Sequence, residues 1–160
     1  MFFVRTASER DLAKVSALLA ETWHATYDAL YGAEKVSELT AKWHSVATLK
    51  ARLERRDAEF VVADDGSALA GMGYAAMAKD RPKAAMLHQL YVLPRFQAQG
   101  IGRDMFAELE TCFPDASTMR LEAFSTGISA GIRCVFLAAS DVSTKPGFTI
   151  WIRMFIFSKS

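Results

Sequence analysis

Apolar positions recur along the chain with helical spacing in two well-marked stretches. Between Leu12 and Leu19 they lie three or four residues apart with charged residues between them, which predicts an amphipathic helix facing a sheet. Ser8, followed three residues later by Asp11, resembles a capping arrangement at the start of this helix. The pattern over Met105–Cys112 predicts another helix, which Pro114 closes.

Short apolar runs bounded by turn residues predict strands. Two of them flank Asp64-Asp65-Gly66-Ser67, so they are expected to form an antiparallel hairpin. Residues 45–56 predict a helix with a basic face, and the aromatic-rich segment 23–32 is expected to be looser than a helix. The order of elements predicts a mixed α/β layer fold in one domain over residues 1–160. The predicted strands cover residues 2–5, 59–63, 68–76, 84–92, 119–123 and 148–157.

Composition narrows the classes of function. The 160 residues are 51% hydrophobic and carry a formal charge of +1, so one core suffices and a strongly basic nucleic-acid footprint is absent. We therefore expect no nucleic-acid partner. Arg133 and Arg153 interrupt the longest apolar runs, which are far shorter than the roughly 20 residues of a membrane helix, so no membrane partner is expected.

The cysteines and the first residues of the chain bear on location. Cys112 and Cys134 form no CxxC pair and have no nearby histidine cluster, which favours free thiols over a disulfide or a metal site. The start of the chain reaches charged residues too early for a signal peptide. A cytoplasmic protein without a metal is the expectation.

One loop carries candidate chemistry. Gln97-Ala98-Gln99-Gly100-Ile101-Gly102-Arg103 lies between a strand ended by Pro94 and a predicted helix. Amides at a helix start lack partners and attract phosphate, and glycines let the main chain come close to it. No Gly-Lys-Ser/Thr follows and the third glycine of a dinucleotide fingerprint is missing, so neither nucleotide motif applies.

This loop and its surroundings resemble the Gcn5-related N-acetyltransferase (GNAT) superfamily, whose coenzyme A loop reads Gln/Arg-x-x-Gly-x-Gly/Ala. The segment Tyr91–Pro94 is similar to the end of that family's fourth strand, and the hairpin at 59–76 is similar to its second and third strands. The resemblance runs from Phe2 to about Glu122. It implies a central, mostly antiparallel mixed sheet with helices on both faces, and acetyl transfer from acetyl-CoA to an amine by direct attack.

The resemblance also implies which residues hold acetyl-CoA. In the family the main chain of the fourth strand bonds the pantetheine arm, and the loop amides hold the pyrophosphate. The implied residues here are Leu90, Tyr91, Val92, Gln97, Ala98, Gln99, Gly100, Ile101, Gly102 and Arg103.

His88 is the candidate general base, because an amine must lose a proton before it attacks and histidine titrates near neutral pH. Its place is similar to that of a catalytic histidine in arylalkylamine N-acetyltransferases. The alternatives are a half-buried histidine that shapes the cleft, or a role for Gln89. Strand alternation predicts that His88 shares a face with Leu90 and Val92, while Gln89 and Tyr91 lie on the other face.

Trp23, Tyr27 and Tyr31 are candidate acceptor-binding residues, since the family often lines its acceptor pocket from this region. An aromatic stripe at helical spacing is also typical of a core. The acceptor is expected to be a small amine or an amino-acid-like molecule; a protein N-terminus or lysine is a further possibility.

The chain departs from the family after residue 122. Family members carry a tyrosine that protonates the departing thiolate, whereas no tyrosine follows Tyr91 here and Phe136 lies near its place, with Cys134 the nearest titratable group. Residues 123–160 hold a single acidic side chain, so this tail is either diverged or read in an altered frame. An alternative function is therefore a degenerate domain that binds CoA without catalysis. The apolar last strand suggests a homodimer.

Overall fold

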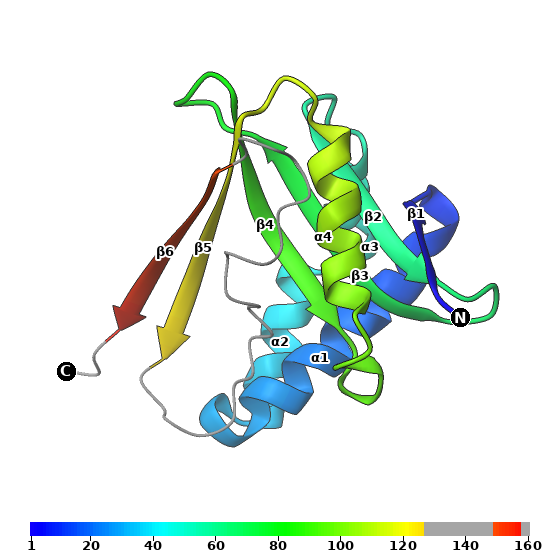
Figure 1. The fold of residues 1–160 in the computed structure, drawn as a ribbon. Helices are drawn as coiled ribbons and strands as arrows, with labels where there is room; N and C mark the ends of the chain where they lie inside the picture. Colours follow the sequence, from blue (N-terminus) through cyan, green and yellow to red (C-terminus); the bar gives the residue numbers. More distant parts are fainter. Residues whose placement is uncertain (127–148, 158–160) are drawn as a thin grey trace.

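The computed structural model describes residues 1–126 and 149–157, and it is built around one six-stranded sheet in the order β1-β2-β3-β4-β5-β6. Neighbours from β1 to β4 are antiparallel, whereas β4–β5 and β5–β6 are parallel (Figure 1). The predicted mixed, mostly antiparallel sheet is confirmed. The elements are β1 (Phe3–Thr6), a 3-10 turn (Glu9–Asp11), α1 (Leu12–Tyr31), α2 (Ala33–Trp43), α3 (Val46–Leu53), β2 (Ala58–Asp64), β3 (Leu69–Met77), β4 (Ala84–Val92), a second 3-10 turn (Pro94–Phe96), α4 (Ile101–Cys112), β5 (Thr118–Thr126) and β6 (Thr149–Phe157).

Helices cover both faces of the sheet, as expected. On one face α4 buries Met105 and Leu109 against the sheet; on the other, α1 and α3 bury Leu19 and Leu49 (Figure 1). Each of these side chains is fully buried, so the two stripes provide the hydrophobic free energy that holds the layers together. Within residues 1–126 and 149–157, no helix has the length and apolar character needed to cross a membrane.

The first helix is longer than expected, so the prediction of a looser segment at 23–32 was wrong. α1 continues to Tyr31, and Gly32, at φ +84°, ends it with its N–H donating to the Asp28 carbonyl. Residues four apart support the added turns: His24 Nδ1 lies 2.6 Å from Asp28 Oδ1. Such i,i+4 pairs stabilise a helix that the aromatic content alone obscured.

An ion network fastens the first strand to the start of α1. Arg5 donates to both oxygens of Asp11 at 2.8 Å, and to Asp64 of β2 at 2.6 and 2.9 Å. Asp11 also accepts from the Ser8 N–H at 2.7 Å, which confirms the predicted capping arrangement. Hydrogen bonds from Arg5 hold the pKa of Asp11 well below its usual range.

β3, β4 and α4 pack closely together at Gly71. A Cβ at this position would lie 2.6 Å from the Tyr91 carbonyl oxygen and 2.8 Å from Met105 Cε. We expect Gly71→Ala to lower the free energy of unfolding by about 2 kcal/mol, because backbone cannot move aside as a flexible side chain can. Gly102→Ala is the control, since its Cβ would meet Val92 at an ordinary 3.7 Å. Equal urea midpoints for the two variants would contradict the packing described.

Candidate functional site

The parallel strands β4 and β5 separate along their length. β4 and β5 pair from Ala84↔Thr118 to Leu87↔Leu121, and beyond Leu87 the described residues give β4 no partner on that side (Figure 1). The cause is a β-bulge. Tyr74 of β3 pairs with Gln89, and the next residue, Ala75, pairs with Leu87, so His88 is the extra residue.

The bulge overturns the predicted alternation of β4. Leu87 packs in the core under α4 together with Leu90 and Val92, although an unbroken alternation along β4 would place it on the opposite face. His88 is exposed, and its ring lies 5.7 Å from that of Tyr74, a residue of the core under α1 and α3. The prediction that His88 shares a face with Leu90 and Val92 was therefore wrong, because the bulge changes the period at His88.

The register also shows which main-chain groups of β4 face away from β3. The Leu93 N–H donates to the Ala70 carbonyl at 2.9 Å, so Leu93 and Ala70 form a hydrogen-bonded pair. Pairs alternate in an antiparallel ladder, so Tyr91 also bonds β3, while Leu90 and Val92 point their N–H and C=O groups toward the side that β5 leaves. The Gln97 side chain donates to the Val92 carbonyl at 3.0 Å.

The loop after β4 turns through two residues with positive φ. Gly100, at φ +83°, is the N-cap of α4, and Ala98 lies at φ +61°, where a Cβ is unfavourable. The first amides of α4 have no acceptor within the helix, so they are available at this turn. Ile101 is buried and presents only its main chain, while Arg103 is exposed with Nε 3.8 Å from Asp104.

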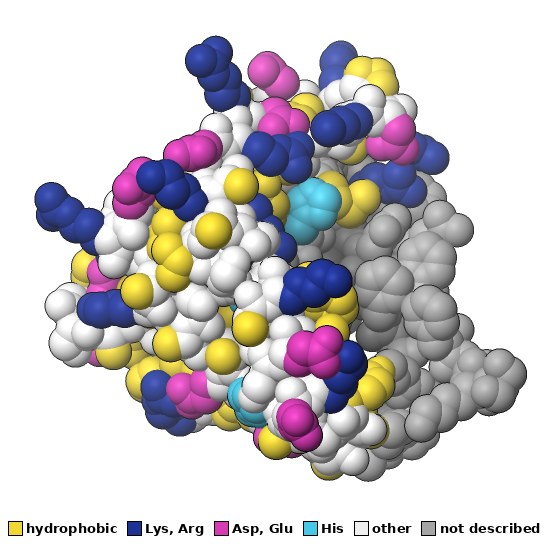
Figure 2. Space-filling model, turned by 180° about the vertical axis from the view of Figure 1, so that it is seen from behind, with side chains coloured by type: hydrophobic (Ala, Val, Ile, Leu, Met, Phe, Trp, Pro, Cys, Tyr) yellow, Lys and Arg dark blue, Asp and Glu magenta, His cyan; other side chains and the backbone are white. Residues whose placement is uncertain are grey.

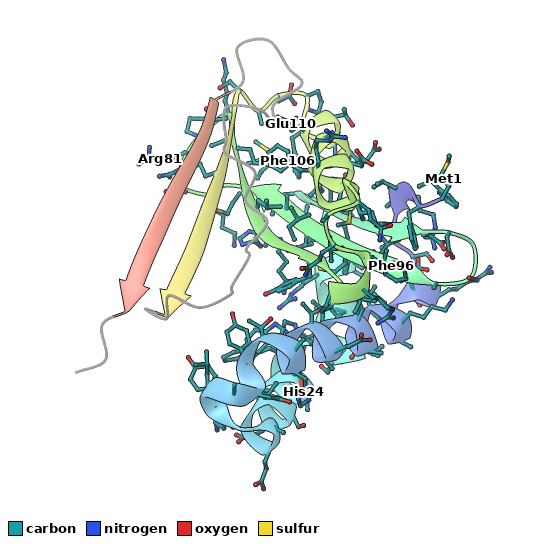
Figure 3. The ribbon with its side chains drawn as sticks, turned by 60° about the horizontal axis from the view of Figure 1, so that its bottom comes forward. Met1, His24, Arg81, Phe96, Phe106 and Glu110 are labelled. Carbon is teal, nitrogen blue, oxygen red and sulfur yellow. The ribbon has the colours of Figure 1, made fainter. Side chains whose placement is uncertain are left out.

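Contacts on the other side of the loop hold it in place. Phe96 packs edge-on against Phe2 with ring centroids 4.9 Å apart, and Arg95 lies over the Phe96 ring at 5.1 Å. Arg95 also forms an ion pair with Glu21 of α1. Figure 3 shows Phe96 after the end of β4 and Arg81 before its start, at opposite ends of the strand. The loop is thus fixed both to the sheet and to α1.

The three predicted acceptor residues lie together on α1. Ring centroids are 4.9 Å apart for Trp23 and Tyr27, and 6.0 Å apart for Tyr27 and Tyr31. Trp23 also packs against Trp43 and His44 at the end of α2, whereas Tyr31 is exposed. The Trp23 end of the stripe is therefore part of a helix–helix contact, and the Tyr31 end is open. Figure 3 places His24, on the same part of α1, away from the sheet.

Arg52 and His44 are features of this region that the sequence did not reveal. Arg52 of α3 donates from one terminal nitrogen to Gln89 Oε1 at 2.7 Å and from the other to the Trp43 carbonyl at 3.3 Å. His44 is 3% exposed, and burial together with the nearby Arg52 lowers its pKa to about 4. Arg52 follows the buried Leu49 by three residues; that spacing places it on the inner side of the helix and is the signal that could have found it.

Comparison with known proteins identifies the family. The sequence profile of the acetyltransferase (GNAT) domain matches residues 27–126, and the chain belongs to this family. No curated protein sequence matches it significantly. The predicted tyrosine position near Phe136, and Cys134, lie outside the described residues.

Solved structures share the fold. The PaiA N-acetyltransferase from Thermoplasma acidophilum, in complex with coenzyme A, is 24% identical, with a TM-score of 0.64 over 71% of this chain and 72% of that one. A putative acetyl transferase from Pyrococcus furiosus has 17% identity and a TM-score of 0.59 over 81% and 85%. AAC(6')-Iy in complex with the bisubstrate analogue CoA-S-monomethyl-acetylneamine has 14% identity and a TM-score of 0.55 over 77% and 80%.

His44 makes a prediction about pH and stability. Its pKa falls from 6.5 to about 4 on folding, so only the unfolded chain binds a proton between these values. This group should therefore lower the free energy of unfolding by about 3 kcal/mol as the pH falls from 6.5 to 4, and change nothing above 7.

His44→Phe removes the titrating group while keeping an aromatic ring beside Trp23. Urea unfolding of wild type and variant at several pH values measures the difference, and the loss of stability in acid should be shallower for the variant. Parallel curves would show that His44 has the same pKa in the folded and the unfolded chain.

Proposed function

We propose that this protein is an N-acetyltransferase that transfers the acetyl group of acetyl-CoA to a primary amine of a small or amino-acid-like molecule. One observation carries the proposal. Beyond the bulge at His88, the main-chain groups of Leu90 and Val92 face the side that β5 leaves, and the strand runs directly into the loop at 97–103. Strand amides that no described strand pairs suit the amide-bearing pantetheine arm, and a helix start suits its pyrophosphate.

The residues around this strand fit the cosubstrate. The Leu90 main chain and the Val92 N–H would bond the pantetheine arm, whereas the Tyr91 main chain bonds β3 and the Val92 carbonyl accepts from Gln97. The pyrophosphate would be held by the turn after β4, with Gly100 supplying the conformation. Two structures with the same fold hold CoA or a CoA-containing analogue, which supports this use of the fold. The proposed loop residues are Gln97, Ala98, Gln99, Gly100, Ile101, Gly102 and Arg103.

The chemistry needs little more from the protein. The neutral amine attacks the thioester carbonyl carbon, an N–C bond forms, the C–S bond breaks, and the electron pair leaves on sulfur. The proton of the amine passes to His88, which is exposed beside Tyr74, either directly or through water. Water protonates the thiolate, a tolerable leaving group because thiols have a pKa of about 8 to 9. Transfer by this route therefore does not require the family tyrosine, near whose predicted place the sequence has Phe136.

The alternative is a domain that binds CoA without catalysis, and the same absence of a tyrosine after Tyr91 favours it. Calorimetry with acetyl-CoA, followed by thiol release with a panel of amines, separates the two functions. Binding with release supports the enzyme, and binding without release for any amine supports the alternative. The acceptor roles of Trp23, Tyr27 and Tyr31, the homodimer and the cytoplasmic location stay predictions.

The proposed pyrophosphate site can be tested with two variants at Gly102 that differ only in charge. Gly102→Asp and Gly102→Asn have the same shape, and a carboxylate in the first turn of a helix does not harm the helix. We expect the Asp variant to bind acetyl-CoA roughly tenfold or more weakly than the Asn variant, because its charge repels the pyrophosphate. Calorimetry measures both constants, and equal constants would place the pyrophosphate elsewhere.

The role of His88 can be tested by its pH dependence. We expect His88→Ala to lose roughly tenfold or more in kcat/KM near pH 6 to 7, with the loss shrinking toward pH 9 as the amine deprotonates unaided. His24→Ala serves as the control, because His24 lies on α1 and pairs with Asp28. A His88→Ala profile identical to wild type at every pH would assign His88 a role in shaping the cleft only.

A further inference from the structure

The guanidinium of Arg52 is held beside the proposed site without a counter-charge. It is half-buried, and two hydrogen bonds fix it: one to the Gln89 side chain and one to the Trp43 carbonyl. Among the described residues no carboxylate lies within 4.0 Å of it, whereas Arg5 pairs with two carboxylates and Arg55 and Arg95 with one each. Partly buried charges normally carry a partner, so a fixed, unneutralised arginine calls for an external one.

The position of Arg52 connects it with the reacting groups. Gln89 follows the bulged His88 directly and precedes Leu90, whose main chain faces the proposed pantetheine arm. The hydrogen bond at 2.7 Å therefore anchors Arg52 against the stretch of β4 that β5 does not pair. Lys and Arg side chains gather around a histidine on the face turned toward the viewer in Figure 2.

The neighbours of Arg52 do not cancel its charge. His44 is buried, and desolvation together with Arg52 keeps its pKa at about 4, so it is neutral near pH 7. Tyr74 and Tyr91 also lie close to the guanidinium, and neither side chain carries a carboxylate. Burial lowers the pKa of Arg52 itself, which agrees with a charge not yet compensated. The local field is thus positive.

The geometry of the bonds leaves donors for a ligand. The two bonds use one N–H on each terminal nitrogen, so Nε–H and a second N–H on each terminal nitrogen remain. Two adjacent N–H groups match the two oxygens of a carboxylate. An acceptor with several ammonium groups and no anion would instead be repelled here.

We propose that Arg52 binds a carboxylate on the acceptor, so that the substrate is an amine that also carries a carboxylate, such as an amino acid. This inference rests on the proposed acetyltransferase function and names its substrate class. Gln89 positions the guanidinium, which explains why a neutral amide rather than a carboxylate is its side-chain partner: the positive charge stays available.

The test compares acceptors that differ only in the carboxylate. Initial rates of thiol release with acetyl-CoA are measured for α- and ω-amino acids, for the carboxamide of each, and for a polyamine and an aminoglycoside. We expect wild type to prefer the carboxylates, and Arg52→Gln to reduce the ratio of kcat/KM for carboxylate over carboxamide by roughly ten- to hundredfold. Comparing ratios between variants removes the difference in amine pKa between the two acceptors.

Two further variants separate the effect of the guanidinium's two-point hydrogen bonding from the effect of its charge. Arg52→Lys keeps the charge and loses the two-point geometry, so it should recover only part of the preference. Arg56→Gln, at an exposed position in the segment after α3, removes the same charge and should leave the ratio unchanged. Replacing Arg52 removes its hydrogen bonds to Gln89 and to the Trp43 carbonyl as well as a half-buried charge, so the thermal midpoint of every variant is measured first, and rates are compared at a temperature where each variant is folded.

The outcomes distinguish this inference from the function on which it rests. Turnover of carboxamides or polyamines at equal or higher kcat/KM than carboxylates overturns the substrate class and leaves the acetyltransferase intact. An unchanged ratio in Arg52→Gln overturns the role of Arg52. No thiol release with any amine overturns the acetyltransferase function, and with it this inference.

Discussion

A single extra residue in β4 determines the shape of the site. Because His88 has no paired residue in β3, β4 bends there, and its pairing with β5 stops at Leu87. Unpaired main-chain groups inside a sheet are costly, so a strand normally keeps both neighbours. No described strand pairs with Leu90 or Val92 on this side, and of their main-chain groups there the Val92 carbonyl is bonded by Gln97. The cost of the remaining groups is offset if a ligand takes the place of a neighbouring strand.

The surrounding structure keeps that open strand rigid. Gln97 bonds the Val92 carbonyl, Phe96 packs against Phe2, and Arg95 pairs with Glu21 of α1. These contacts attach the loop to β4, to the chain before β1 and to the opposite helical layer. Binding therefore needs little ordering of the loop, which lowers its entropic cost. The left-handed conformation of Ala98 is a local strain that these contacts maintain.

Much of the fold could be predicted from the sequence because its signals are local. The turn residues at 64–67 predict the hairpin of β2 and β3. Pro94, together with Gly100 and Gly102, predicts the unit of β4, loop and α4. The bulge at His88 could not be predicted in this way, because alternation assumes an unbroken period and only the register with β3 breaks it. The aromatic and polar content of residues 23–32 predicts a loose segment, whereas contacts between residues four apart, such as His24 and Asp28, hold α1 together as far as Tyr31.

The candidate site could also be predicted only in part from the sequence. The loop at 97–103 has its own motif, whereas the bond from Arg52 to Gln89 joins residues 37 apart in sequence and depends on how α3 packs on the sheet. No periodicity contains that information. The sequence holds one indication of this contact: Arg52 follows the buried Leu49 by three residues, a spacing that places its charge on the side of the helix that faces the sheet.

Two basic residues that lie close together, His44 and Arg52, differ in their charge near pH 7. His44 is neutral near pH 7 because burial and Arg52 both oppose its protonation, so it contributes shape and no charge. Arg52 keeps its charge at every physiological pH, since guanidinium does not titrate there. The ammonium of an acceptor entering alone would raise the energy of this positive region, but in the proposed substrate class a carboxylate on the same molecule would neutralise Arg52 first. The amine would then meet a region without net charge, where the proposed loss of its proton to His88 would not be opposed by a nearby anion.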